Sequence, residues 1–123
     1  MATEAQPAKQ AKLLVVEDDV LIRMLLADML GEIGYTVAAE AASIDEALEA
    51  TKNADFDIAI LDANLNGQPV SPVADALIAR GTPFVVATGY GDLPKPYRDR
   101  PTLRKPFQID GLKGMLQSTL DTR

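Results

Sequence analysis

The chain has 123 residues, of which 47% are hydrophobic and 24% charged, and it carries a net charge of −6. This length suits one domain with a packed core, and the composition is that of a globular protein rather than a disordered chain. The sequence has no cysteine and no histidine. Disulfides, Cys/His metal sites and Cys or His nucleophiles are therefore excluded, so any chemistry must use carboxylates, hydroxyls and amines.

The charge is unevenly distributed along the chain. Residues 17–62 contain most of the acids and only two basic residues, Arg23 and Lys52, so we expect no binding to nucleic acid. Basic residues gather instead in residues 95–105, which can steer a protein partner. The apolar runs are too short to span a membrane and none forms a signal peptide, so we expect a cytoplasmic protein without a membrane partner.

Short apolar runs of strand length alternate with helix-like segments from residue 12 onward. Residues 1–11 are polar and lack a period, so we expect a flexible tail at 1–11 and one domain at 12–123. The expected strands are Leu13–Val16, Tyr35–Ala38, Ile58–Leu61, Phe84–Ala87 and Thr102–Arg104.

The expected helices have recognisable ends. Asp19 is placed to cap the first helix, and Gly34 to stop it. Ser43 and Glu46 form a capping box for the second. The third opens at Ser71 with Pro72 as its first helical residue, and ends before Gly81. A last helix carries Leu112, Met115, Leu116 and Leu120.

Strands that alternate with helices through short connections predict an α/β fold, a doubly wound parallel sheet with helices on both faces. Ligands of such sheets bind beyond the carboxyl ends of the strands. Polar residues stand at four of these ends: Glu17, Asp18 and Asp19 after the first strand, Asp62 at the third, Thr88 at the fourth and Lys105 at the fifth.

Carboxylates crowded at one sheet edge repel one another, and a hard divalent cation relieves that repulsion. Mg²⁺ fits best because it accepts one or two carboxylates and completes its octahedron with water or carbonyl oxygens. We assign Asp18 and Asp62 as direct ligands, Glu17 as a ligand through water or a charged neighbour, and Asn64 as a ligand through its backbone carbonyl. The simpler interpretation is that the acids cap the first helix, but that leaves Asp62 unexplained.

Asp62 ends a buried strand, where its carboxylate can attack phosphorus and form an aspartyl phosphate. The hydroxyl of Thr88 can donate to a phosphoryl oxygen, and the ammonium of Lys105 can pair with another or with Asp62 itself. Each residue alone has a structural alternative: a turn at Asp62, an ordinary strand end at Thr88 and an exposed lysine at a turn. The phosphoryl-transfer hypothesis depends on the occurrence of all three residues, in this order, at successive strand ends.

The motifs VVEDD, ILDANLNG, VVATG and LRKPF resemble those of a response-regulator receiver domain. The resemblance implies a flavodoxin-like five-stranded sheet of order 2-1-3-4-5, with Mg²⁺ at Glu17 and Asp18. It also implies phosphoryl transfer from the phosphohistidine of a histidine kinase, or of a phosphotransfer protein, to Asp62. By position, Thr88 matches the family's switch hydroxyl and Lys105 its lysine.

The sequence departs from the family pattern in three places. Thr102 stands where an aromatic switch residue is common, NLNG replaces a usual Met-Pro pair, and the prolines of residues 89–101 predict a short or irregular fourth helix. The stretch PFVVATGYG resembles the motif of alphaproteobacterial single-domain receivers called FAT GUY, with Val86 in place of its Phe. Tyr90 is therefore a second candidate switch residue beside Thr88; alternatively, it is an ordinary loop tyrosine.

We expect a stand-alone receiver that promotes its own phosphorylation and dephosphorylation at Asp62 and is not a turnover enzyme. Its output is expected through protein contact, at residues 89–105 and the last helix. One rival is a Mg²⁺-dependent aspartyl-phosphate phosphohydrolase, but Asn64 stands where that class has a second Asp. The other rival is a receiver-like interaction module that is never phosphorylated.

Overall fold

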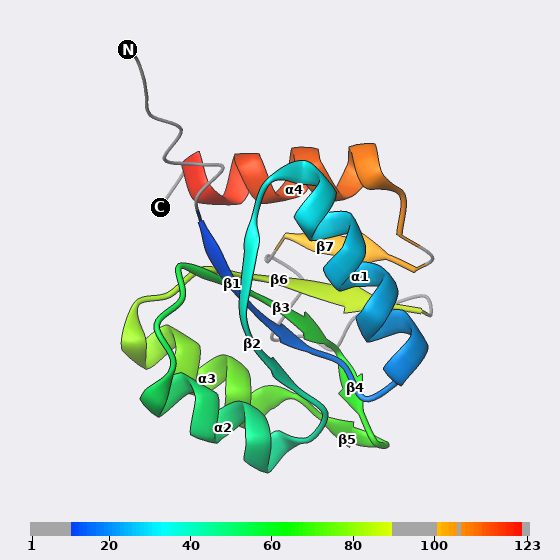
Figure 1. Ribbon diagram of the computed structural model, residues 1–123. Coiled ribbons are helices and arrows are strands. Elements are labelled where there is room, and N and C mark those ends of the chain that lie inside the picture. The colour runs from blue at the N-terminus through cyan, green and yellow to red at the C-terminus, as the bar shows by residue number, and fades with distance from the viewer. Residues whose placement is uncertain (1–10, 90–100, 106, 122–123) are drawn as a thin grey trace.

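The computed structural model describes residues 11–89, 101–105 and 107–121. Five parallel strands form one sheet in the spatial order β2-β1-β3-β6-β7 (Figure 1). Their bounds are β1 Lys12–Val16, β2 Thr36–Ala41, β3 Ile58–Asp62, β6 Phe84–Thr88 and β7 Thr102–Arg104. Counted along the chain, these are the five expected strands, and their order confirms the predicted 2-1-3-4-5.

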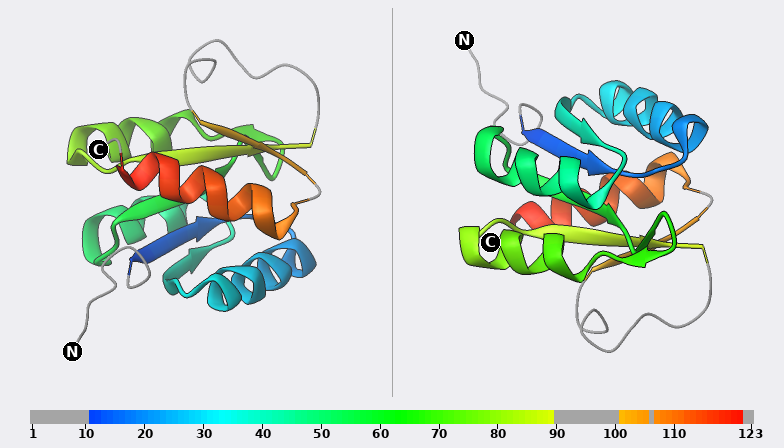
Figure 2. Two further views of the ribbon diagram at one scale, coloured as in Figure 1. Left: turned by 90° about the horizontal axis from the view of Figure 1, so that it is seen from above. Right: turned by 90° about the horizontal axis from the view of Figure 1, so that it is seen from below.

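Four helices among the described residues cover the two faces of this sheet: α1 Val20–Ile33, α2 Ile44–Asn53, α3 Ser71–Arg80 and α4 Ile109–Asp121. Figures 1 and 2 show α2 and α3 side by side on one face, with α1 and α4 on the other. None of the helices in the described ranges is long and apolar enough to cross a membrane. The predicted irregular fourth helix falls mainly on residues 90–100, which lie outside the described residues.

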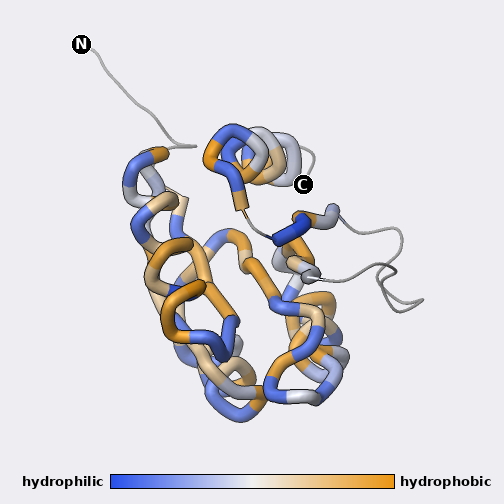
Figure 3. The backbone as a smooth tube through the Cα atoms, turned by 90° about the vertical axis from the view of Figure 1, so that its right-hand side faces the viewer, coloured by the Kyte–Doolittle hydropathy of each residue, from blue (hydrophilic) through white to orange (hydrophobic). Residues whose placement is uncertain are grey.

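The alternation of side chains along β1 divides the interior into two cores. Leu14 and Val16 pack toward α2 and α3, whereas Leu13 and Val15 pack toward α1 and α4. β3 and β6 are buried along their whole length, as expected for central strands covered on both faces. Figure 3 shows apolar residues running through the strands and along much of α1.

The helix ends follow the predicted signals closely. The Asp19 carboxylate accepts hydrogen bonds from the N–H groups of Leu21 and Ile22, and the Ser43 hydroxyl accepts from the N–H of Glu46. Gly34 ends α1 in the left-handed conformation. The start of α3 differs, because Val70 is its N-cap and Ser71, not Pro72, is the first helical residue.

Two segment boundaries also differ from the prediction. β2 runs from Thr36 to Ala41, beyond the expected Ala38, because this edge strand alternates between covered and exposed positions and has no continuous apolar run. Ala11, expected in the tail, is buried and its carbonyl accepts from the N–H of Thr36 at 3.1 Å. The packed part of the chain therefore includes Ala11, and residues 1–10 lie outside the described residues.

A short hairpin that was not predicted follows β3. Its strands are β4 Asn64–Leu65 and β5 Gln68–Pro69, joined by Asn66 and Gly67, which both have positive φ. Two positive φ angles are typical of the two-residue turn that Asn-Gly favours. The NLNG sequence therefore folds back over the end of the sheet.

Two glycine substitutions should shift stability in opposite directions. Gly81 ends α3 at φ 78°, where an L side chain is strained, so Gly81→Ala should lower the free energy of unfolding by about 1 kcal/mol. Gly31 lies inside α1, so Gly31→Ala should raise it by about 0.5–1 kcal/mol. A Cβ meets open space at both positions, so the pair isolates the backbone effect in urea denaturation. A gain at Gly81 would contradict the left-handed cap.

Candidate functional site

The carboxyl ends of the parallel strands meet at one edge of the sheet. Hydrogen bonds between neighbouring strands place the polar residues at this edge. The N–H of Glu17 donates to the carbonyl of Ala41 at 3.0 Å, and the N–H of Lys105 donates to the carbonyl of Thr88 at 2.9 Å. Asp62 lies within β3, opposite Ala87 of β6. The backbone positions of these residues are therefore set by the sheet itself.

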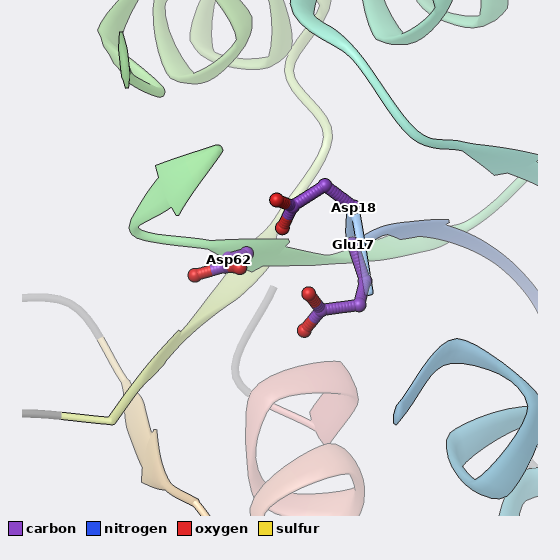
Figure 4. A group of neighbouring side chains, drawn as sticks. All are labelled: Glu17, Asp18 and Asp62. Carbon is purple, nitrogen blue, oxygen red and sulfur yellow. The ribbon is translucent and has the colours of Figure 1, made fainter. Parts of the chain in front are cut away.

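Three carboxylates converge at this edge. Glu17, Asp18 and Asp62 each place a carboxylate oxygen within 4.8 Å of the others (Figure 4). Glu17 is 3% exposed and Asp62 is 7% exposed, so two of the three charges are largely removed from water. Buried like charges at this separation are costly unless cations compensate them.

Lys105 provides part of that compensation. Its Nζ lies 2.7 Å from Oε1 of Glu17 and 3.2 Å from Oδ2 of Asp62. The pairing with Asp62 was predicted from the sequence, whereas the shorter pairing with Glu17 was not. Lys105 pairs with two of the three carboxylates and not with Asp18, so its single positive charge does not balance the three acids when all are ionised.

The carboxylate oxygens of the acids differ in their hydrogen-bond partners. Both carboxylate oxygens of Glu17 already have partners, since Oε1 binds Lys105 and Oε2 accepts from the N–H of Asp19 at 3.0 Å. The Asp18 carboxylate accepts a long hydrogen bond from the N–H of Asn66 at 3.3 Å. The donor set of closely spaced carboxylate oxygens with residual negative charge fits Mg²⁺.

A pocket of about 490 Å³ opens beside the carboxylates. Asp62, Asn64, Thr88 and Lys105 line it, together with Ile22 of α1. Thr88 is buried at the end of β6, and Asn64 begins β4 directly beyond Asp62. The structure thus brings together the predicted site residues that it describes, while Tyr90, the second candidate switch residue, lies outside the described residues.

Two residues that form hydrogen bonds at this edge of the sheet were not predicted from the sequence. Asn66 donates its backbone N–H to Asp18 and its side-chain amide to the carbonyl of Ala42 at 3.0 Å. The Asn-Gly dipeptide was a usable signal, because it is the strongest short-range hairpin pattern. Arg23 donates to the backbone carbonyl of Glu17 at 2.8 Å, and no sequence pattern singled it out.

The environment shifts the ionisation of the cluster. Burial raises the pKa of Glu17 to about 7, against the lowering effect of its hydrogen bond from Lys105. Burial opposes the charged form of Asp18, but hydrogen bonds with Glu17 and the backbone outweigh it and hold the pKa of Asp18 below its ordinary value. Burial also opposes the charge of Lys105, yet the partnership with Glu17 and Asp62 raises the pKa of Lys105.

The raised pKa of Glu17 predicts a pH-dependent loss of stability in the absence of divalent cations. Between pH 4.5, the ordinary pKa of a glutamate, and about pH 7, the folded chain holds a proton that the unfolded chain has released. The unfolding free energy of the wild type should therefore fall relative to Glu17→Gln as the pH rises through this window. The measurement is urea denaturation of both proteins across this range in a chelating buffer.

Added Mg²⁺ should reduce that difference, because the cation favours the ionised carboxylate. A carboxyl carbon titration by NMR gives the midpoint of Glu17 directly. A midpoint at or below 4.5 without Mg²⁺ would show that Lys105, rather than burial, controls this group.

Comparisons with known proteins agree with this arrangement. Residues 13–98 match the response regulator receiver domain family. The transcriptional regulatory protein PdtaR of Mycobacterium tuberculosis is 34% identical over 116 residues, which are 89% of this chain and 57% of PdtaR. The chain therefore spans little more than half the length of the curated relatives it matches.

Solved structures give the same result. The solution structure of SdrG from Sphingomonas melonis Fr1 has a TM-score of 0.82 and 40% identity, over 91% of this chain and 98% of that one. The BeF₃-activated conformation of SdrG has a TM-score of 0.79 and 43% identity, over 89% of this chain and 95% of that one. The PhyR receiver domain of Erythrobacter litoralis shares the fold, with a TM-score of 0.79 and 23% identity over 93% of this chain and 92% of that one.

These matches confirm the predicted family, and the likeness to SdrG is consistent with the FAT GUY resemblance. The strand order, the acidic edge and the lysine beside Asp62 correspond to the expectations drawn from the motifs. The chain belongs to the response-regulator receiver domain family.

Proposed function

We propose that this chain receives a phosphoryl group on Asp62 from a phosphohistidine, in a Mg²⁺-dependent reaction, and signals through contact with a protein partner. The observation that carries this proposal is the placement of Asp62, which is 7% exposed, among the acids, Lys105 and Thr88 at one strand edge. Membership of the receiver family supports the same chemistry.

In the proposed transfer, an Asp62 carboxylate oxygen attacks the phosphorus while the bond between phosphorus and the donor imidazole nitrogen breaks. The electron pair of that bond leaves with the imidazole, which takes up a proton from solvent. Bound Mg²⁺ would be held by Asp18, Asp62 and the backbone carbonyl of Asn64, with Glu17 as its charged neighbour, and would neutralise phosphoryl oxygen charge.

The chain's own cation and hydroxyl stabilise the product. Lys105 already lies 3.2 Å from Asp62, so a small movement of its ammonium suffices to reach a phosphoryl oxygen. Thr88 lines the same pocket and can donate its hydroxyl to another oxygen. The new charge of about −1.5 to −2 would compete with Glu17 for Lys105, which couples transfer to a local rearrangement.

The readout is proposed to be a protein surface rather than DNA or a membrane. Thr88 directly precedes residues 89–105 and Lys105 ends them, and Lys105 shares a second pocket with Gly89 and with Phe107, which precedes α4. A change at Asp62 would therefore act on Thr88 and Lys105 at the two ends of this stretch. We therefore place the partner surface at residues 89–105 and α4.

The two rival functions have less support. An aspartyl-phosphate phosphohydrolase of the haloacid-dehalogenase type needs a second acid two residues after the nucleophile, and Asn64 cannot act as a general acid. A silent interaction module has no need for a lysine held between two largely buried carboxylates. We therefore propose that Asp62 acts as a phosphoacceptor and that the chain turns over no external substrate.

Intact mass spectrometry tests the proposal. Incubation with phosphoramidate and Mg²⁺ should add one phosphoryl group to the wild type and none to Asp62→Asn. Lys105→Met should accept phosphoryl at least tenfold more slowly, since it removes the cation beside the transferred charge. A chelator should abolish the reaction in the wild type and in Lys105→Met.

The matched control is Lys12→Met, because the ammonium of Lys12 pairs with the exposed Asp55 at the opposite end of β1. It should be phosphorylated at the wild-type rate. An unmodified wild type that binds no Mg²⁺ would overturn the proposal and favour the silent module.

A further inference from the structure

Arg23 links the acidic edge to the neighbouring strand. It lies in the first part of α1, five residues after Asp18, and its side chain turns back toward the end of β1. Its Nη1 donates to the backbone carbonyl of Glu17 at 2.8 Å, and its Nε donates to Oε1 of Glu40, on β2, at 3.0 Å. The Arg23 side chain is 19% exposed, and its bond to the Glu17 carbonyl is partly buried, whereas its bond to Glu40 lies at the surface.

We propose that Arg23 is a positioning residue for the metal-binding acids. Its guanidinium fixes the peptide between Glu17 and Asp18, and thereby the direction in which the Asp18 carboxylate points. The inference rests on the proposed function, since it assigns a role in holding the Mg²⁺ ligands of that site.

The peptide between Glu17 and Asp18 is where the chain leaves the sheet. The N–H of Glu17 still pairs with Ala41 on β2, but its carbonyl follows the last residue of β1. A backbone carbonyl at such a position needs a donor from elsewhere, and Arg23 supplies it. Because the peptide unit is planar, holding this oxygen also holds the Cα of Asp18.

The shape of the guanidinium suits this task. Its nitrogens point in fixed directions within one plane, so one group can bind a carbonyl on one side and a carboxylate on the other. The ion pair with Glu40, 44% exposed at its side chain, contributes little energy by itself. Its role here is directional, because it orients the guanidinium toward Glu17.

The positive charge of Arg23, bound to the backbone of Glu17, offers a second explanation, in which Arg23 only reduces the repulsion among the acids. Arg23→Lys separates the two, because lysine keeps the charge but presents a single ammonium that cannot reproduce the planar fork. Glu40→Gln keeps Arg23 and weakens only the outer end of the bridge.

The experiment compares Mg²⁺ dissociation constants, measured by calorimetry, with melting temperatures measured in chelator. Arg23→Lys should bind Mg²⁺ about tenfold more weakly, the lower end of the effect of losing an outer-shell partner. Glu40→Gln should weaken binding by a smaller factor. Phosphorylation of both variants should recover at saturating Mg²⁺, since Asp62 itself is untouched.

Arg80→Lys is the matched control. Arg80 also donates to backbone carbonyls, those of Thr51 and Phe56, but it belongs to α3 and does not contact the acids. This variant should lower the melting temperature and leave the Mg²⁺ dissociation constant unchanged.

Two results would overturn the positioning role. Wild-type Mg²⁺ affinity together with a wild-type melting temperature in Arg23→Lys would show that the charge alone suffices. Wild-type affinity with a lower melting temperature would show a purely structural role. In both cases the proposed function would still hold if the wild type binds Mg²⁺ and is phosphorylated. Absence of Mg²⁺ binding by the wild type would overturn both proposals.

Discussion

The structure is organised around a charge conflict at the carboxyl edge of its sheet. Three carboxylates lie within 4.8 Å of one another, and two of them are almost fully buried. Such an arrangement persists where cations or a bound proton oppose the repulsion, and the raised pKa of Glu17 shows the second of these. Lys105 meets two of the acids, and the remaining negative charge makes the edge a receptor for a divalent cation and then for a phosphoryl group.

The fold brings these carboxylates together through the order of its strands rather than through long loops. Parallel strands end at the same edge, so residues far apart in the chain meet once the strand order is set. Asp62 ends the central strand β3, with Glu17 and Asp18 following β1 on one side and Thr88 ending β6 on the other. Lys105 follows the edge strand β7 and reaches across to Asp62 with its long side chain.

Local sequence patterns were enough to predict the strands, the helix caps and the residues that form the site. Buried strands read as apolar runs, Asp19 and Ser43 as caps, and the site residues as the polar residues that follow the runs. The strand order came from the family resemblance rather than from the residues. The functional roles of the site residues remain predictions.

What could not be predicted depends on how side chains reach across the fold. The 2.7 Å pairing of Lys105 with Glu17 joins residues 88 positions apart, and only the rotamers and the register decide it. The bridge made by Arg23 needs β2 to extend as far as Glu40, and the broken apolar pattern of that edge strand concealed the extension. The β4–β5 hairpin was readable from Asn66 and Gly67, but its strands have two residues each and form no apolar run of strand length.

The central claim is that Asp62 carries the phosphoryl group, and chemical trapping tests it most directly. Borohydride reduces an aspartyl phosphate to homoserine, which peptide mass spectrometry locates by residue. After treatment with phosphoramidate and Mg²⁺, the account predicts homoserine at position 62 alone. Reduction at Glu17 or Asp18, or no reduced residue in a protein that gains phosphoryl mass, would contradict it.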